Sequence, residues 1–209
     1  MFFSLFTALA LITSVNAHFR LLYPEPRGPF VADNEPNFCG GYNNAVNNRS
    51  TFPLSGGFFT IKSGHPGWTA GVIISTVQNP NSFDNFSVNG EQQIVGAYAK
   101  SDDAGTFCMP LDISAAKIDG VKDGANVTIQ IVFAGGDGNL YQCADLTLSS
   151  NFTVPSNVVC ANETAAPHGS ETSGGASPSQ TAGALGAAHV FAGYVALLLG
   201  FIGAATLLA

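Results

Sequence analysis

The distribution of charge along the chain constrains its fold more than any other feature. All seven Lys and Arg residues lie between Arg20 and Lys122, and all fourteen Asp and Glu residues lie between Glu25 and Glu171. Both ends are therefore free of charge, and the last 21 residues form a continuous apolar run. The polar middle of about 150 residues has the size of one domain. We expect a single folded domain between two segments that serve other purposes.

The first of these segments, residues 1–17 (MFFSLFTALALITSVNA), has the short apolar core of a secretory signal peptide. Val15 and Ala17 stand at positions −3 and −1 of a signal-peptidase site. Because no Lys or Arg follows Met1, the amino terminus alone supplies the positive charge that such signals carry. Cleavage after Ala17 makes His18 the first residue of the mature protein.

The apolar run at the other end, residues 189–209, is long enough to cross a bilayer but ends without a basic cluster. Small residues near Ser173, a polar spacer and this tail match the three parts of a GPI-attachment signal. We expect attachment near Ser173, a Ser/Thr/Gly-rich stalk over residues 161–173, and removal of residues 174–209. A tail-anchored helix is the alternative. The anchored protein is then expected on the outer face of the plasma membrane or in the cell wall.

The secreted part carries the marks of an extracellular glycoprotein. Its cysteines should form two disulfides, and because none lies in a C-x-x-C pair, zinc and iron–sulfur sites are disfavoured while three pairings stay open. The cysteines are Cys39, Cys108, Cys143 and Cys160, and the N-x-[ST] sequons are at Asn48, Asn85, Asn126, Asn151 and Asn162.

The formal charge of −7 and the lack of any basic run disfavour nucleic-acid binding, which needs a Lys/Arg surface against the phosphates. We expect a monomer with no nucleic-acid partner.

The middle of the chain has the pattern of an all-β protein. In residues 127–133 Val, Ile, Ile and Phe alternate with Thr, Gln and Val, which predicts a half-buried antiparallel strand. Gly-, Pro- and Asn-rich turns separate the segments, and the one helix candidate, residues 113–118, is short. We predict an immunoglobulin-like or fibronectin III-like antiparallel β-sandwich of seven or eight strands. The clearest strands are residues 58–61, 72–77, 93–98, 127–133 and 140–148.

The histidines offer the most specific chemistry. Of the four, His168 lies in the predicted stalk and His189 in the segment removed with the GPI signal, so the folded domain keeps only His18 and His65. As the first residue, His18 can chelate one metal ion with its free amine and Nδ1 together. His65, on a loop between two predicted strands, can add a third nitrogen. Such a nitrogen-rich, tetragonal set favours Cu(II), and we expect one Cu(II) per chain.

Several motifs, taken together, resemble the fungal GPI-anchored copper proteins related to lytic polysaccharide monooxygenases, over the span from His18 to Cys160. The resemblance implies a histidine brace of His18 and His65 on an immunoglobulin-like sandwich, copper handling at the cell surface, and no polysaccharide cleavage. A membrane copper importer is a candidate partner. The motifs are His18 after the signal peptide, RG (27–28), FCGGY (38–42), FPL (52–54), GHP (64–66), TIQ (128–130) and GGDGNLYQCADL (135–146).

The resemblance further implies an aspartate as the next copper ligand. Asp137 is our choice, because it lies beside the axial position that the cellulose-active monooxygenases fill with tyrosine and this chain with Leu140. Asp145 is the second candidate, or a buried structural acid. Gly138 stands where those enzymes keep a glutamine that steers oxygen chemistry. The same alignment pairs Cys39 with Cys143, leaving Cys108 with Cys160.

Two other functions stay open at this point. One is a copper-dependent monooxygenase acting on cell-wall polysaccharide, against which Leu140 and Gly138 argue. The other is a GPI-anchored structural wall glycoprotein without a metal. The sole tryptophan, Trp68, is expected to pack in the core rather than to contact a glycan.

Overall fold

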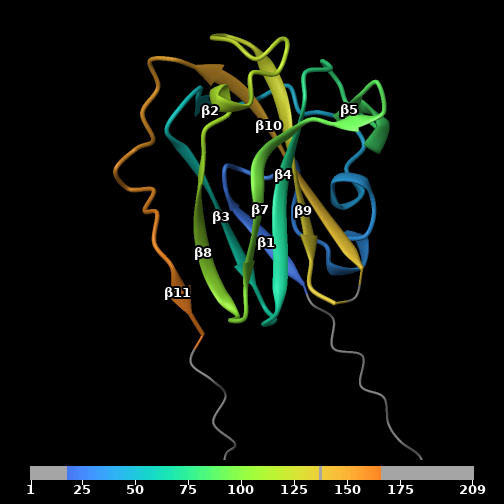
Figure 1. The fold of residues 1–209 in the computed structure, drawn as a ribbon, viewed down its shortest axis with the longest axis vertical. Coiled ribbons are helices and arrows are strands. Elements are labelled where there is room, and N and C mark those ends of the chain that lie inside the picture. The colour runs from blue at the N-terminus through green and yellow to red at the C-terminus, as the bar shows by residue number, and fades with distance from the viewer. Residues whose placement is uncertain (1–17, 137, 166–209) are drawn as a thin grey trace, which may run out of the picture. The chain divides into compact units, whose positions relative to one another are not determined.

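The computed structural model describes residues 18–136 and 138–165, which fold as two packed β-sheets (Figure 1). The first sheet has the order β1-β3-β8-β11 and the second the order β2-β10-β9-β4-β7. All neighbours are antiparallel except β2 and β10. The bounds are β1 (Phe19–Tyr23), β3 (Gly57–Ser63), β8 (Gly105–Leu111) and β11 (Glu163–Thr164), then β2 (Ser50–Pro53), β4 (Trp68–Ser75), β7 (Ile94–Ser101), β9 (Asn126–Ala134) and β10 (Asn139–Ser149).

This architecture confirms the predicted β-sandwich. The five predicted strands correspond to β3, β4, β7, β9 and β10, although β4 ends at Ser75 and the two residues after it are exposed. The short hairpin β5 (Ser87–Val88) and β6 (Glu91–Gln92) and the short edge strands raise the count above the one predicted. The central strands were predictable because they are long and β-rich, whereas β1, which follows the signal segment directly, and β8, which contains Pro110, were not.

The described residues contain no α-helix, only four 3₁₀ turns. The helix expected over residues 113–118 is the three-residue turn η4 (Ser114–Ala116), which ends where Lys117 adopts a left-handed conformation with φ of 52°. The others are η1 (Ala32–Asn34), η2 (Phe38–Gly41) and η3 (Phe83–Phe86). No helix in the described part of the chain is long and apolar enough to cross a membrane, and the predicted signal peptide and apolar tail lie outside those residues.

β9 is more deeply buried than the alternation in its sequence indicates. Val127, Ile129, Ile131 and Phe133 face the main core between the sheets, as expected. The intervening Thr128, Gln130 and Val132 are also buried, so the prediction of a half-buried strand is wrong. The second face is covered because a smaller cluster packs there, with Phe38 of η2, Phe86 of η3 and the cystine Cys39–Cys143.

The other expectations about packing hold. Trp68 is 2% exposed and its ring packs against Phe107 and Phe133, as expected for a core residue. The disulfides are Cys39–Cys143 and Cys108–Cys160, the pairing that the resemblance implies.

The predicted stalk does not begin at residue 161. β11 pairs with β8 and the amide of Ala165 donates to the carbonyl of Ala104, so residues 161–165 belong to the domain. These residues have low hydrophobicity, and they are held by the cystine Cys108–Cys160, by edge pairing and by a hydrogen bond from the Cys108 amide to Oδ1 of Asn162. The remainder of the stalk, Ser173 and the segment after it lie outside the described residues. Residues 18–165, apart from the gap at residue 137, contain both sheets, the core of the described residues and both disulfides, so we expect this span to fold on its own.

Candidate metal centre

Three chain segments that are far apart in sequence meet at one end of the sandwich, the lower end in Figure 1. The start of β1 pairs with the end of β3, with Phe19 opposite Ser63. β4 begins just after the β3–β4 turn, and its Thr69 lies opposite Ala134 at the end of β9. Ala134 in turn lies opposite Asn139, where β10 begins. The segment at His18, the turn with His65 and the turn joining β9 to β10 therefore occupy the same end.

His18 and the turn that carries His65 are joined directly. The amide of Gly64 donates a hydrogen bond to the carbonyl oxygen of His18, at 3.0 Å. The turn is held in shape by Ser63, whose hydroxyl donates to the carbonyl of His65 at 2.7 Å. Gly67 closes the turn with φ of 74°, a conformation that favours glycine. These hydrogen bonds place the two histidines on neighbouring backbone segments, which a metal site formed by both would require.

The hydrogen bond of the His65 ring selects its tautomer. Nδ1 of His65 lies 3.0 Å from the carbonyl oxygen of Pro66. Because a carbonyl oxygen only accepts, Nδ1 must carry the proton, and Nε2 of the neutral ring keeps its lone pair. A backbone carbonyl on one ring nitrogen is the usual way in which a metal-binding histidine is oriented. This contact leaves Nε2 of His65 available for another partner.

The His18 ring has a different partner. Its Nδ1 lies 2.5 Å from Oε2 of Glu35, and the His18 side chain is 39% exposed whereas Glu35 is 1% exposed. When Glu35 is ionised, Nδ1 carries the proton that Glu35 accepts. A chelate through the terminal amine and Nδ1 needs the lone pair of that same nitrogen, so the ring must leave Glu35 before it can bind a metal in that way.

Glu35 is itself fixed by several contacts. Its Oε1 accepts from the amide of Phe19 at 3.1 Å and from Nε2 of Gln142 at 3.4 Å. Its carbonyl oxygen accepts from the amide of Tyr141 on β10. Burial raises the pKa of the Glu35 carboxyl, while the hydrogen bonds from Phe19 and His18 lower it in part. Oε1 of Glu35 therefore has two partners among the described residues, whereas Oε2 has only His18.

Gln142 connects this group to the sandwich. Its Nε2 donates to the carbonyl of Phe19 at 2.7 Å, and its Oε1 accepts from the amide of Leu21 at 2.9 Å. Gln142 on β10 thereby holds the first strand, and with it the position of His18. Sequence reasoning missed both Glu35 and Gln142, because Glu35 is a single acid in an irregular loop and Gln142 an ordinary strand residue. The one sequence signal that could have singled out Glu35 is its proximity to the FCGGY motif.

The structure describes only one of the two candidate aspartates. Asp137 lies outside the described residues, and only the strands that flank its turn are placed. Asp145 lies within β10, opposite Thr128 and away from the end that holds the histidines. Each of its oxygens is engaged: Oδ1 accepts from Nη2 of Arg27 at 2.9 Å and the Thr128 hydroxyl at 2.6 Å, and Oδ2 from Nε of Arg27 and the amide of Val46.

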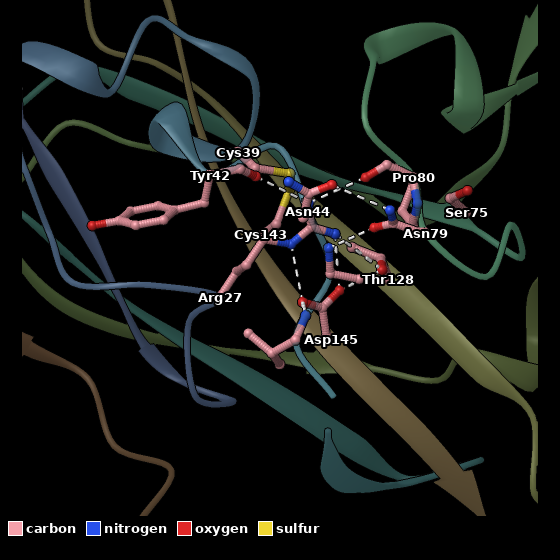
Figure 2. Close-up of polar contacts among 12 residues, drawn as sticks. Arg27, Cys39, Tyr42, Asn44, Ser75, Asn79, Pro80, Thr128, Cys143 and Asp145 are labelled. Carbon is pink, nitrogen blue, oxygen red and sulfur yellow. Dashed lines mark hydrogen bonds and ion pairs between the residues drawn. A yellow bond between two sulfur atoms is a disulfide. The ribbon is translucent and has the colours of Figure 1, made fainter. Parts of the chain in front are cut away.

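Figure 2 shows this group, in which Arg27 lies between Asp145 and the carbonyls of Tyr42 and Pro80. Arg27 and Asp145 are 6% and 2% exposed. Burial acts to raise the pKa of the Asp145 carboxyl, but the hydrogen bonds from Arg27 and Thr128 outweigh it and lower that pKa below its ordinary range. A carboxylate with all its acceptor positions filled has a structural role, and Asp145 ties the loop after η2 to β10.

Within residues 18–136 and 138–165, no three His, Cys, Asp or Glu side chains lie close enough together to hold a metal ion. Among the described residues, His18 and His65 are the imidazole donors at this end of the sandwich. If cleavage follows Ala17, as the sequence predicts, the freed amine adds a third nitrogen, and Glu35 or the β9–β10 turn can add an anionic donor. This donor set fits a nitrogen-rich Cu(II) site once the signal segment is removed.

The fold and the two histidines at one end define a disulfide-linked, immunoglobulin-like β-sandwich with a candidate metal centre. A family model described as copper acquisition factor BIM1-like matches residues 16–165. The chain belongs to this family.

Three named relatives are similar to this chain over about three quarters of its length. The copper acquisition factor BIM1 of Cryptococcus neoformans var. grubii serotype A is 44% identical over 157 residues, 74% of this chain and 71% of the relative. Its counterpart in var. neoformans serotype D is 40% identical over 163 residues, 77% of this chain and 73% of the relative. The lytic polysaccharide monooxygenase-like protein X325 of Yarrowia lipolytica is 30% identical over 166 residues, 76% of this chain and 60% of the relative.

Proposed function

We propose that this protein acquires copper at the cell surface, binding one Cu(II) through the amine and Nδ1 of His18 and Nε2 of His65. The observation that carries the proposal is the backbone bond between Gly64 and His18, which holds the two histidines on adjacent segments. The tautomer of His65 supports it, because Nε2 is left free to bind. We infer that the metal is copper from the names of the Cryptococcus relatives.

In the proposed site Asp137 adds the anionic ligand, since Asp145 is committed to Arg27. Glu35 acts on His18 as a positioning residue. Glu35 holds the His18 ring through Nδ1 when no metal is bound. When Cu(II) takes the place of Glu35 at Nδ1, the buried negative charge of Glu35 remains near the ion. Both carboxylates favour retention of the dipositive ion.

We propose further that the site does not oxidise polysaccharide. Leu140, the second residue of β10, has a side chain that is 6% exposed and packed in the core. It offers no donor where the related monooxygenases have their axial tyrosine, and Gly138 offers no side chain for oxygen chemistry. An anionic ligand would also occupy a coordination position that an oxygen-activating copper needs open. The likeness to the Yarrowia monooxygenase-like protein makes assays for peroxide and oxidised oligosaccharides the necessary check.

The proposed location is the outer face of the plasma membrane or the cell wall, through a GPI anchor near Ser173. There the domain would pass copper to a membrane copper importer. The sequons suit an extracellular surface, since Asn48, Asn151 and Asn162 are exposed and Asn85 and Asn126 half-buried in the protein without glycans.

The deciding experiment compares two soluble proteins that span residues 18–165, one beginning at His18 and one with a single extra Gly before it. The extra residue keeps both imidazoles and displaces the free amine. We expect tight one-to-one Cu(II) binding and a nitrogen-rich axial EPR spectrum for the first protein only. Equal weak binding by both proteins would leave an anchored structural glycoprotein as the better interpretation.

A further inference from the structure

Two basic side chains stand opposite each other beside the candidate copper centre. Arg20 of β1 and Lys62 of β3 are direct cross-strand partners, and both are exposed. Like charges in this arrangement destabilise a sheet. Neither side chain forms an ion pair with a carboxylate of the described residues. Two of only seven Lys and Arg residues in a chain of net charge −7 are thus placed together next to His18.

These side chains line a surface cleft that includes His18. The cleft has a volume of about 370 Å³, and Arg20, Lys62, Gly64, Phe30 and His18 line it. The guanidinium carbon of Arg20 lies 4.3 Å from the centroid of the Phe30 ring, and this ring meets His18 edge-on at 6.0 Å between centroids. Stacking on Phe30 restrains the guanidinium, so that less conformational entropy is lost when it binds a planar anion.

The charge of this cleft does not suit a bare dipositive ion, which Arg20 and Lys62 would repel. It suits an anion that carries the ion. Guanidinium and ammonium groups bind carboxylates through charge-assisted hydrogen bonds, and Arg matches a carboxylate with two parallel bonds. A second carboxylate of the same small molecule can reach Lys62 across the strand pair.

We propose that this cleft binds the carboxylates of a small anionic copper chelate, so that copper reaches His18 and His65 as a multi-carboxylate complex and not as the free ion. This inference rests on the proposed function. The transfer is a ligand exchange in which carboxylate oxygens leave the copper and protein nitrogens replace them. The terminal amine releases its proton to solvent, the His18 ring carries its proton on Nε2 instead of Nδ1, copper stays Cu(II), and Arg20 and Lys62 retain the freed carboxylates.

The test measures the rate of Cu(II) uptake by the 18–165 protein from two donors, the anionic copper nitrilotriacetate and the cationic copper bis(ethylenediamine). Charge reversal by R20E/K62E should slow uptake from nitrilotriacetate about tenfold or more and leave uptake from the cationic donor unchanged or faster. The matched control is K117E/K122E, which changes the net charge equally at two exposed lysines outside the cleft. Equal slowing for both donors, or an equal effect of the control, would overturn the proposal.

A second measurement uses no copper and so separates this proposal from the proposed function. Titrating the metal-free protein with nitrilotriacetate should shift the NMR signals of Arg20, Phe30, Lys62 and Gly64, and R20E/K62E should abolish the shifts of Phe30 and Gly64. If those signals do not move, the cleft does not bind carboxylates, even where copper binding by His18 and His65 is intact. If they move but the wild-type protein takes copper from neither donor, the proposed function fails and copper delivery through the cleft fails with it.

Discussion

Glu35 and His18 form the closest polar contact of the candidate centre, with 2.5 Å between Oε2 and Nδ1. The contact joins a buried carboxylate to the nitrogen that the proposed amine chelate requires. Metal binding therefore exchanges one partner of Nδ1 for another. Because Glu35 is otherwise held by the Phe19 amide and by Gln142, its charge stays at the site during that exchange.

The first prediction concerns this charge. E35Q preserves the size of the side chain and removes its negative charge, and we expect Cu(II) affinity to fall about tenfold, because a nearby carboxylate no longer attracts the dipositive ion. Competition titration against a copper chelator measures it. D33N, which neutralises an exposed acid two residues away, should leave the affinity unchanged. Wild-type affinity in E35Q would show that Glu35 has no energetic link to the copper.

The second prediction separates the two aspartates. D137N should lower Cu(II) affinity about tenfold or more, equivalent to about 1.4 kcal/mol, and alter the EPR spectrum while leaving the unfolding midpoint unchanged. D145N should do the reverse, because it leaves Arg27 buried without its charged partner and lowers the free energy of unfolding by about 3–5 kcal/mol. Urea unfolding and EPR on both variants measure the two effects. A wild-type EPR spectrum for D137N would remove this residue from the ligand set.

The third prediction follows from the pKa of Asp145, which is lower in the folded protein than in the unfolded chain. A lowered carboxyl pKa stabilises the fold above the unfolded value of about 3.9, and this contribution is lost as pH falls through the folded pKa. The stability difference between the wild type and D145N should therefore be constant at neutral pH and shrink below about pH 4. Urea unfolding curves recorded from pH 7 to pH 3 measure it, and a constant difference down to pH 3 would contradict the assignment.

The fourth prediction compares the two disulfides. Their sequence separations are 104 and 52 residues, and loss of either should destabilise the domain by about 2–5 kcal/mol. Only Cys39–Cys143 holds the loop that presents Glu35, so C39A/C143A should also weaken Cu(II) binding. C108A/C160A should keep the wild-type affinity, because that bond holds the C-terminal segment to β8. Thermal unfolding and copper titration at a temperature where both variants are folded provide the measurements.

The amino-acid sequence was enough to predict the class of fold and to single out two histidines as candidate metal ligands. Strands such as β9 and β10 are long, β-rich and bounded by turn residues, so local pattern predicted them. His18 and His65 stood out because the folded domain has no other imidazole. The family resemblance supplied the disulfide pairing.

The surroundings of those histidines depend on how distant segments of the chain pack together. Glu35 reaches His18 across 17 residues, and Arg27 reaches Asp145 across 118, by paths that no local periodicity reports. The burial of both faces of β9 and the pairing of β11 with β8 likewise depend on which distant segment covers them. Local patterns encode which residues favour a strand or a turn, whereas the partner of a buried polar group depends on how the whole chain packs.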